Sequence, residues 1–126
     1  MSDQLIFHMC KSSLWQAVQQ GGLYRGSGDD IADGFIHFST ADQLVESVAR
    51  HRAGITGLLL IAVNPDDLGK ALKWEPSRRG QLFPHLYGPL EVSKVISADK
   101  LPLGEDGIHV FPDSVLSSKA AKPLMF

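Results

Sequence analysis

The chain is poor in cysteine, because Cys10 is the only one among its 126 residues. A lone thiol can form neither an internal disulfide nor a cysteine-based zinc cluster. His8 lies two residues away on the same face of a predicted strand, but nothing specific in the sequence indicates a reactive thiol. We therefore expect a small buried cysteine in a reducing compartment rather than a nucleophile.

Long hydrophobic runs and an excess of charge of one sign are also missing. The longest apolar run, Gly57 to Val63, is far shorter than the ~20 residues that span a bilayer. The first residues lack the positive segment and the long apolar segment of a secretory signal. A net charge of −2, with acidic and basic residues interleaved, creates no field that attracts nucleic acid or anionic membranes. We expect a cytoplasmic protein with no membrane partner, and nucleic acid is not favoured as a partner.

The composition that remains is typical of one folded domain. Hydrophobic residues make up 44% of the chain and charged residues 21%, which suits a buried core with a soluble surface. We predict a single domain over residues 1–126, with its core at about 4–98. The C-terminal tail, residues 99–126, is predicted to be irregular because it carries prolines and no strong periodicity. The sequence leaves the oligomeric state open.

Local patterns predict the first elements of the domain. Residues 5–10 alternate as a strand. Ser13 and Gln16 fit the capping box of a helix that Gly21 would end by adopting a left-handed conformation. Residues 24–34 are rich in glycine, serine and aspartate, so we predict a loop there that acts as a flap over a neighbouring site.

The middle of the chain predicts a strand, a helix and a central strand. In residues 34–40 the period of two separates Ile36 and Phe38 from His37, so His37 faces outward if the aliphatic face is the core. A second capping box follows and predicts a helix. Residues 57–63 form a continuous apolar run, which is typical of a strand buried on both faces.

Shorter strands complete the predicted core. Residues 72–75 form a short strand, and a charged loop follows it. The residue before a proline avoids the helical conformation, so residues 83–87 are extended and place Phe83, His85 and Tyr87 on one side. With a last strand at about 92–98, these strands and helices predict an α+β fold.

Polar side chains in apolar strands are the main functional signal. His37, Glu75, His85 and Tyr87 each lie in an otherwise apolar extended segment. Imidazole titrates near neutral pH and a partly buried carboxylate can have its pKa raised, so this set can donate, accept and orient protons. The structural alternative is that each histidine is a satisfied polar group that ties a loop to the sheet. The sequence leaves both interpretations open.

Residues beside these segments are candidate ligand-binding groups. Ser39 and Thr40 precede a helix whose free N–H groups favour an anion, although their simplest role is capping. Arg78 follows Glu75 in a loop, where a guanidinium can hold a phosphate in bidentate fashion, although a solvated charge is the simpler role.

A metal site is not expected. His8, His37 and His85 offer the three imidazoles of one kind of zinc site. The sequence shows no ligand spacing such as H-x-x-x-H, so we predict no metal ligands.

Three separated motifs carry a family resemblance, and they occur in order with short spacers: Gly34-Phe-Ile-His-Phe-Ser-Thr40, Lys73-Trp-Glu75 and Phe83-Pro-His-Leu-Tyr-Gly-Pro-Leu90. Across roughly residues 4–98 the chain resembles the bacterial and plant family called domain of unknown function 952. The resemblance implies a fold similar to that of ADP-ribosyltransferases and RNA 2′-phosphotransferases. In that ADP-ribosylation fold a split, strongly bent, mostly antiparallel sheet with two main helices holds a nucleotide cleft. The resemblance implies no established activity.

The same resemblance suggests roles for single residues. His8 lies on the first strand, where the superfamily often carries His-Gly-Thr. His37 stands where a ring often packs on nicotinamide, and the hydroxyl side chains that follow it resemble those of the superfamily. Glu75 is the preferred ribose-binding carboxylate because of its motif, and Glu91 is the rival by its order along the chain.

Our leading functional hypothesis is a cleft for a nucleotide- or NAD-like ligand. His37 and Tyr87 would contact a base, Arg78 would hold a phosphate, and Glu75 with His85 would supply acid/base or ribose contacts. Such a cleft suits an enzyme resembling an ADP-ribosyl or phosphate transferase. Two alternatives stay open: a non-catalytic module that binds a small molecule, and an interaction domain, which a dry and filled cleft would favour.

Overall fold

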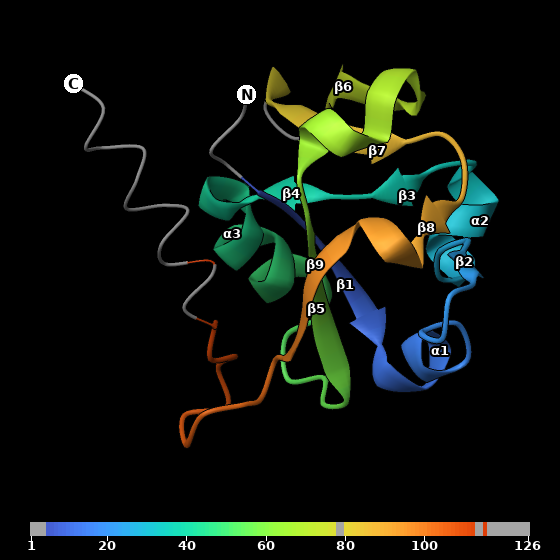
Figure 1. The fold of residues 1–126 in the computed structure, drawn as a ribbon. Coiled ribbons are helices and arrows are strands. Elements are labelled where there is room, and N and C mark those ends of the chain that lie inside the picture. Colours follow the sequence, from blue (N-terminus) through green and yellow to red (C-terminus); the bar gives the residue numbers. More distant parts are fainter. Residues whose placement is uncertain (1–4, 78–79, 113–114, 116–126) are drawn as a thin grey trace.

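The computed structural model describes residues 5–77, 80–112 and 115, which form short helices and antiparallel strands (Figure 1). The helices are α1 (Ser12–Gln16), α2 (Gly28–Asp33) and α3 (Ala41–His51), with 3₁₀ helices η1 (Pro65–Ala71) and η3 (Val92–Lys94). The strands are β1 (Ile6–Lys11), β2 (Leu23–Tyr24), β3 (Ile36–His37), β4 (Ser39–Thr40), β5 (Leu58–Val63), β6 (Leu72–Pro76), β7 (Leu82–Leu86), β8 (Leu90–Glu91) and β9 (Val95–Lys100).

The strands pair in separate antiparallel sheets. One sheet has the order β4-β1-β5-β9, a second has the order β3-β7-β6, and β2 pairs with β8. The expected mixture of helices with antiparallel sheet is therefore confirmed. The last strand lies a little later than expected, because residues 92–94 form η3 before β9 begins.

The segment expected to be one strand over residues 34–40 divides between two sheets. β3 pairs with β7, and β4 pairs with β1. Between them, the backbone N–H of Phe38 donates a hydrogen bond of 3.0 Å to the carbonyl of Pro84, and the Phe38 side chain is buried. As predicted, Ile36 and Phe38 face the core while His37 is only half-buried. The split carries His37 to the edge of the core, where it meets β7.

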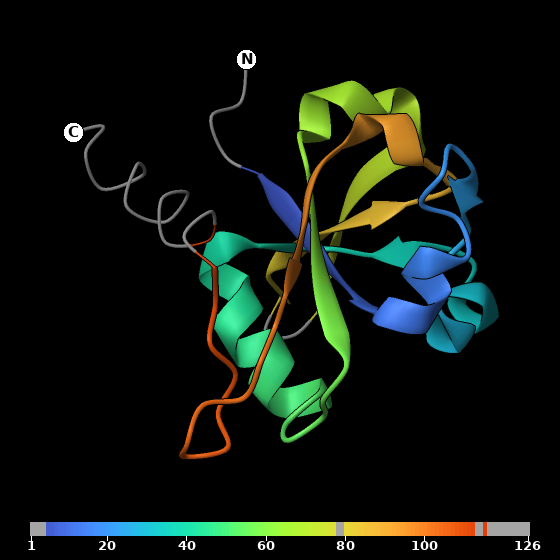
Figure 2. The same ribbon diagram turned by 60° about the horizontal axis from the view of Figure 1, so that its bottom comes forward.

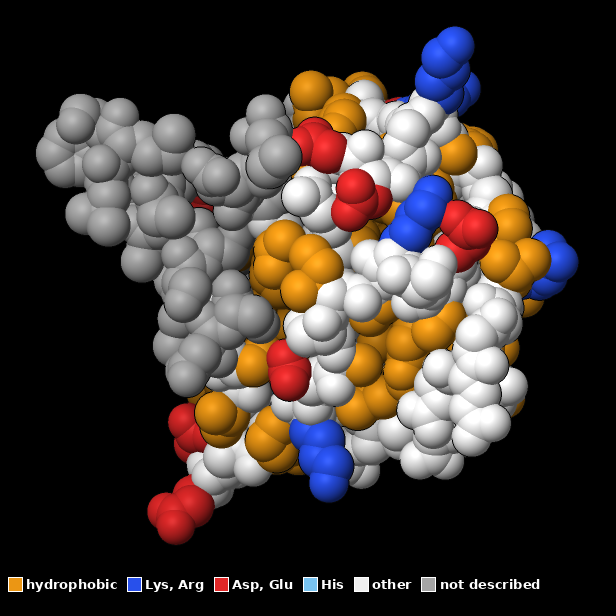
Figure 3. All heavy atoms as spheres, viewed as in Figure 1, with side chains coloured by type: hydrophobic (Ala, Val, Ile, Leu, Met, Phe, Trp, Pro, Cys, Tyr) orange, Lys and Arg blue, Asp and Glu red, His pale blue; other side chains and the backbone are white. Residues whose placement is uncertain are grey.

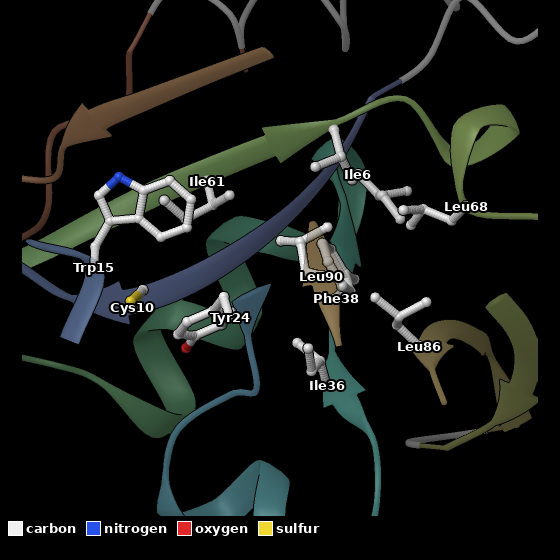
Figure 4. Packing of buried hydrophobic residues seen from close by; sticks show 11 residues of the cluster. Ile6, Cys10, Trp15, Tyr24, Ile36, Phe38, Ile61, Leu68, Leu86 and Leu90 are labelled. Carbon is white, nitrogen blue, oxygen red and sulfur yellow. The ribbon is translucent and has the colours of Figure 1, made fainter. Parts of the chain in front are cut away.

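The core lies on both faces of β5. Leu58, Leu60 and Ala62 pack with Phe7 on the face that α3 covers. The opposite face of the sheet carries a second cluster, which Figure 4 shows around β1: Ile6, Cys10, Trp15, Tyr24, Ile36, Phe38, Ile61, Leu68, Leu86 and Leu90. The apolar run at residues 57–63 was expected to be buried on both faces, and this is confirmed.

The predicted capping box of α3 is also confirmed. The backbone N–H of Gln43 donates to Thr40 Oγ1 at 3.3 Å, and the backbone N–H of Thr40 donates to Gln43 Oε1 at 3.0 Å. Leu44 and Val48 face the sheet, as their spacing requires. In Figure 2, α2 and α3 lie at opposite ends of the segment that contains β3 and β4.

Two local predictions were wrong. α1 begins at Ser12 with Lys11 as its N-cap and no side-chain capping bond, so Ser13 lies inside the helix. Residues 24–34 are not a loop, because they contain the end of β2 and all of α2. The acidic third residue after Ser27 completes a capping box there, and this local stabilisation outweighs the glycine content of the segment.

Charges are mixed on the surface that Figure 3 shows, where acidic and basic side chains are interleaved. Within the described ranges, no helix is long and apolar enough to cross a membrane. Residues after the last strand contribute to the core through Leu101 and Val115. In the tail, His109 forms an isolated bridge with Leu103.

Candidate functional site

A cavity of about 430 Å³ lies where α2, α3, β1 and β7 approach the β3–β4 segment. We call it the histidine cleft, and its lining includes His8, His37, His85, Asp29, Asp30 and Asp33. A volume of this size is within the range of small-molecule sites in proteins. The strands hold the histidines in place, since His37 and His85 are paired across β3 and β7.

His85 is held from behind by a glutamate. Its Nδ1 lies 2.8 Å from Glu75 Oε1, and the Tyr87 hydroxyl donates to the same oxygen at 2.7 Å. The pairing of Glu75 with Phe83 across β6 and β7 places the glutamate two residue pairs away from His85, and therefore on the same face. Hydrogen bonds, from His85 first and then from Tyr87, hold the pKa of Glu75 below its ordinary value. The charged Glu75 in turn raises the pKa of Tyr87.

These contacts determine which nitrogen of His85 is available. An ionised carboxylate only accepts hydrogen bonds, so His85 Nδ1 must carry the proton that points at Glu75. The Nε2 atom of His85 has no partner within the described part of the chain, and the residue, at 8% exposure, lines the cleft. When Nδ1 alone carries a proton, Nε2 is the ring's proton acceptor, and it belongs to a residue that lines the cleft.

His37 has the opposite arrangement, because both of its ring nitrogens face carboxylates. Nδ1 lies 2.5 Å from Asp30 Oδ1, and Nε2 lies 3.0 Å from Asp33 Oδ2. Two carboxylate acceptors require two N–H donors, so the ring is an imidazolium. The hydrogen bond to Asp30, assisted by the charge of Asp33, raises the pKa of His37 above its ordinary value. His37 therefore presents a fixed positive charge to the cleft.

Asp30 connects the residues on the His37 side of the cleft. It is buried, and burial alone would oppose its ionisation, but the hydrogen bonds from His37 and the loop before α2 outweigh that effect and bring its pKa well below the ordinary value. Asp30 accepts from the backbone N–H of Ser27 at 2.7 Å, from the Ser27 hydroxyl at 2.9 Å and from the backbone N–H of His37 at 3.0 Å. One carboxylate thus joins α2 to β3.

His8 completes the wall as a neutral ring. Its Nδ1 donates to the carbonyl of His37 at 2.7 Å, and its Nε2 lies 2.7 Å from the hydroxyl of Tyr24, which therefore donates. Burial lowers the pKa of His8, although Asp30 opposes that shift. Burial also raises the pKa of Tyr24, which favours its role as a donor. With both nitrogens occupied, His8 positions the backbone of His37.

An aromatic side chain supports the two histidines and Tyr87. The ring of Phe35 stacks on His85, with 4.1 Å between ring centroids, and lies 4.6 Å from the ring of His37 and 5.2 Å from that of Tyr87. The His37 and His85 centroids are 5.7 Å apart. Both histidines can therefore contact one small ligand.

The structure gives the other predicted site residues different positions. Ser39 lines the cleft, and its hydroxyl donates to Ser47 at 3.3 Å. Thr40 caps α3. Glu91 lies on β8 and pairs with Lys94 at 3.0 Å, so Glu75 rather than Glu91 is the acid that contacts a cleft histidine. Arg78 lies outside the described residues, but its neighbour Ser77 lines the cleft.

Three residues that shape the site were not predicted from the sequence. Asp30 and Asp33 fell within the segment expected to be a loop, and no role in the site was expected for Phe35. The S-x-x-D pattern at Ser27 was the available signal for Asp30, because it predicts an aspartate fixed at the start of a helix. No local pattern links Phe35 to His85, since their contact depends on the pairing of β3 with β7.

Among the residues that the structure describes, no group of three or more His, Cys, Asp or Glu side chains is arranged to hold a metal ion. Burial raises the pKa of the Cys10 thiol, which lies in the core away from the cleft lining. A thiol with a raised pKa is a weak nucleophile at neutral pH. The titratable side chains that line the cleft within the described residues are imidazoles, carboxylates and the guanidinium of Arg52.

Comparison with known proteins places the chain next to a family without an assigned activity. The sequence model of the family described as "Protein of unknown function (DUF952)" matches residues 9–98. The X-ray crystal structure of protein CC0527 from Caulobacter crescentus is 42% identical, with 89% of this chain and 98% of that chain covered and a TM-score of 0.83. The solution NMR structure of CC0527 is 44% identical over 82% of this chain and 90% of that chain, with a TM-score of 0.74. No curated protein matches the chain.

Proposed function

The chain belongs to the DUF952 family, and we propose that its histidine cleft binds a nucleotide- or NAD-like small molecule and exchanges a proton with it through His85. The observation that carries the proposal is the contact between Glu75 and His85. A carboxylate behind Nδ1 fixes the ring and leaves Nε2 directed to the cleft, which is the arrangement of a general base that is oriented by a third group.

His37 would have an electrostatic role rather than a proton-transfer role. Both of its nitrogens are occupied, so it carries charge without accepting a proton. A fixed cation in a partly enclosed site stabilises negative charge on a ligand or in a transition state. The two histidines thus suit different roles: His85 has a ring nitrogen without a partner in the described residues, and His37 has a positive charge that its carboxylate partners stabilise.

The aromatic group suggests the class of ligand. Phe35, His85 and Tyr87 form adjoining rings, of which His85 lines the cleft, and such a surface suits a planar base. Glu75 has a second carboxylate oxygen for a ribose hydroxyl, and Arg78 follows the cleft residue Ser77 in the chain. These features fit a nucleotide, and the similarity to the ADP-ribosylation fold that the sequence motifs imply is part of this proposal. A reaction of the ADP-ribosyl or phosphate transfer class follows from that similarity alone.

The second candidate function is binding without turnover. Binding without turnover is favoured by His8 and His37, because both nitrogens of each ring already have hydrogen-bonding partners. These rings therefore form a rigid surface and are not free acids or bases. The two candidates share one site and differ only in whether a product forms. The interaction-domain alternative would have been favoured by a filled cleft, whereas the cavity here is about 430 Å³.

A ligand panel with matched glutamate variants tests the proposal. We would screen NAD, ADP-ribose, mononucleotides and 2′-phosphorylated RNA ends by thermal shift, since a ligand of the native state raises Tm. Bound compounds would then be followed by calorimetry and by mass spectrometry for products. Glu75→Gln removes the charge behind His85, while Glu91→Gln makes the same change outside the cleft.

We expect wild type and Glu91→Gln to bind the same compound with the same Kd. In Glu75→Gln and His85→Ala we expect binding to weaken and any turnover to fall by about 10²-fold, the usual scale for loss of an acid–base group. Binding with no product in wild type would select the binding module. Unchanged affinity and turnover in both cleft variants would contradict the proposal.

A further inference from the structure

The two carboxylates that hold His37 differ in how firmly they are fixed. Asp30 is 3% exposed and accepts hydrogen bonds from Ser27 and from His37. Asp33 is 54% exposed, and within the described part of the chain its carboxylate makes one polar contact, the 3.0 Å pair with His37 Nε2. Only the Asp33 carboxylate can therefore leave His37 without breaking other bonds in the described structure.

The position of Asp33 does not stabilise its helix. It is the last residue of α2, where free carbonyl groups make negative charge unfavourable. The chain then turns at Gly34, which has a left-handed φ of 87°. The ion pair with His37 stabilises the Asp33 carboxylate, whereas the free carbonyl groups at the end of α2 destabilise it. Another anion can therefore easily replace this carboxylate at His37.

The charges of the cleft explain why an incoming anion has to replace one of its carboxylates. Three aspartates, Asp29, Asp30 and Asp33, face one arginine and the His37 imidazolium across the same cavity. Arg52 already lies 3.7 Å from Asp29. An incoming anion would meet a wall with excess negative charge unless it replaced one of these carboxylates. Asp33 is the one whose replacement exposes an N–H donor.

A second observation directs a ligand to the same place. His85 is nine-tenths buried, its Nε2 has no partner within the described ranges, and the residue lines the cavity that His37 also lines. The ring centroids of His37 and His85 are 5.7 Å apart. A ligand with an anionic group at His37 can thus place a second polar atom at His85 Nε2.

We propose that the ligand of the histidine cleft carries an anionic oxygen group, a phosphate or a carboxylate, which binds Nε2 of His37 in place of Asp33. This inference rests on the proposed function, because it names the part of the ligand that contacts the charged histidine. The Asp33 carboxylate occupies the position of the ligand's anion until that anion arrives. No covalent step is involved, since one N–H donor exchanges one oxyanion acceptor for another.

The test uses inorganic phosphate and acetate as separate probes, so that the two kinds of anion are distinguished. Each is titrated at about pH 6, where the His37 ring is charged, and the imidazole signals of His37 and His85 are followed by NMR. The proteins are wild type, Asp33→Asn, Asp29→Asn and His37→Gln. Asp29→Asn is the matched control, because it removes the same charge from the same cleft wall without touching His37.

We expect one of the two anions to shift the His37 signals of the wild type in a saturable way. Asp33→Asn should bind it about 3- to 10-fold more tightly because the competing carboxylate is gone, while Asp29→Asn should change the Kd less than about 2-fold. His37→Gln should lose the response. An equal gain in affinity in both aspartate variants would show that only the net charge of the cleft matters, and it would overturn the inference. An unchanged Kd in Asp33→Asn would also overturn it.

The failure of this inference is distinguishable from failure of the proposed function. If nucleotides shift the His85 signals while neither anion moves His37, the inference is wrong and the proposed cleft stands. If an anion binds His37 in competition with Asp33 but no compound of the panel binds the protein, the inference holds for an anionic ligand that is not a nucleotide.

Discussion

At the scale of single residues, His85 and His37 differ in how many carboxylates contact their rings within the described part of the chain. His85 has one carboxylate partner, Glu75, and His37 has two, Asp30 and Asp33. The difference decides which ring can accept a proton and which ring carries a lasting charge. Sequence analysis selected both histidines and Glu75 because polar residues stood out in apolar strands. The sequence assigned His37 to a base contact rather than to a fixed charge, because the carboxylate partners of His37 lie on another element.

The charge of His37 predicts a pH dependence of stability. Its pKa is raised above the ordinary value of 6.5, so its contribution to stability is complete below pH 6.5 and is lost as the pH rises through the raised pKa. The groups that face it are Asp30 and Asp33 of α2, His8 of β1 and His85 of β7. His8 acts in the opposite sense: with a lowered pKa it destabilises the fold as the pH falls below 6.5.

Urea denaturation of wild type and His37→Gln between about pH 5.5 and about 8.5 measures the contribution of His37 to stability, because the contribution of His8 is common to both proteins. The free energy of unfolding of the wild type, relative to the variant, should fall by about 0.5–1 kcal/mol as the pH rises, a small value because His37 is half-exposed. Parallel profiles for the two proteins would contradict the assignment of an imidazolium.

At the scale of elements, α2 and the loop before it determine where the acidic wall lies. Ser27 caps α2 and binds Asp30, and Asp30 binds β3 through His37. The longer regular elements were predictable, since β5 and α3 follow local periodicity and capping. α2 was missed because a helix of six residues gives little periodic signal within a glycine-rich segment. The division of residues 34–40 into β3 and β4 was missed because it depends on which partner strand each half meets.

Before and after α2, two glycines are predicted to differ in how much a substitution by alanine lowers the free energy of unfolding. Gly26 has a φ of 99°, and a Cβ atom there would lie 2.5 Å from the Cβ of Asp30. Gly34 has a φ of 87° but no atom within 4 Å of such a Cβ. Gly34→Ala should cost about 1 kcal/mol of unfolding free energy for backbone strain alone. Gly26→Ala should cost about 2–4 kcal/mol, because it also displaces a buried, hydrogen-bonded carboxylate.

Urea denaturation compares the two glycine variants, and an NMR titration of His37 gives a second measure. Displacement of Asp30 in Gly26→Ala should lower the pKa of His37 towards its ordinary value, while Gly34→Ala should leave it unchanged. Equal losses of stability in the two variants, with no change in the titration of His37, would show that Asp30 does not depend on the packing of this loop.

At the scale of the whole molecule, the site lies where the two main sheets meet. The four-stranded sheet supplies His8 through β1, and the β3-β7-β6 sheet supplies His37, His85 and Glu75. The family motifs placed the last three residues together in advance, and the structure pairs their strands. Asp30 could not be connected to them from the sequence, because the contact requires α2 to fold back onto β3. Local patterns predicted the polar residues of the strands, whereas long-range packing decided what holds each of them.

The central claim is that Glu75 directs the free Nε2 of His85 to the cleft while His37 stays charged. A long-range ¹H–¹⁵N correlation spectrum of the histidine side chains at about pH 7 tests it directly, because it reports which ring nitrogens carry protons. The signals are assigned with His85→Gln and His37→Gln. We predict that His85 carries a proton on Nδ1, which faces Glu75, and that His37 carries protons on both nitrogens. A His85 ring with its only proton on Nε2, or a neutral His37, would contradict this prediction.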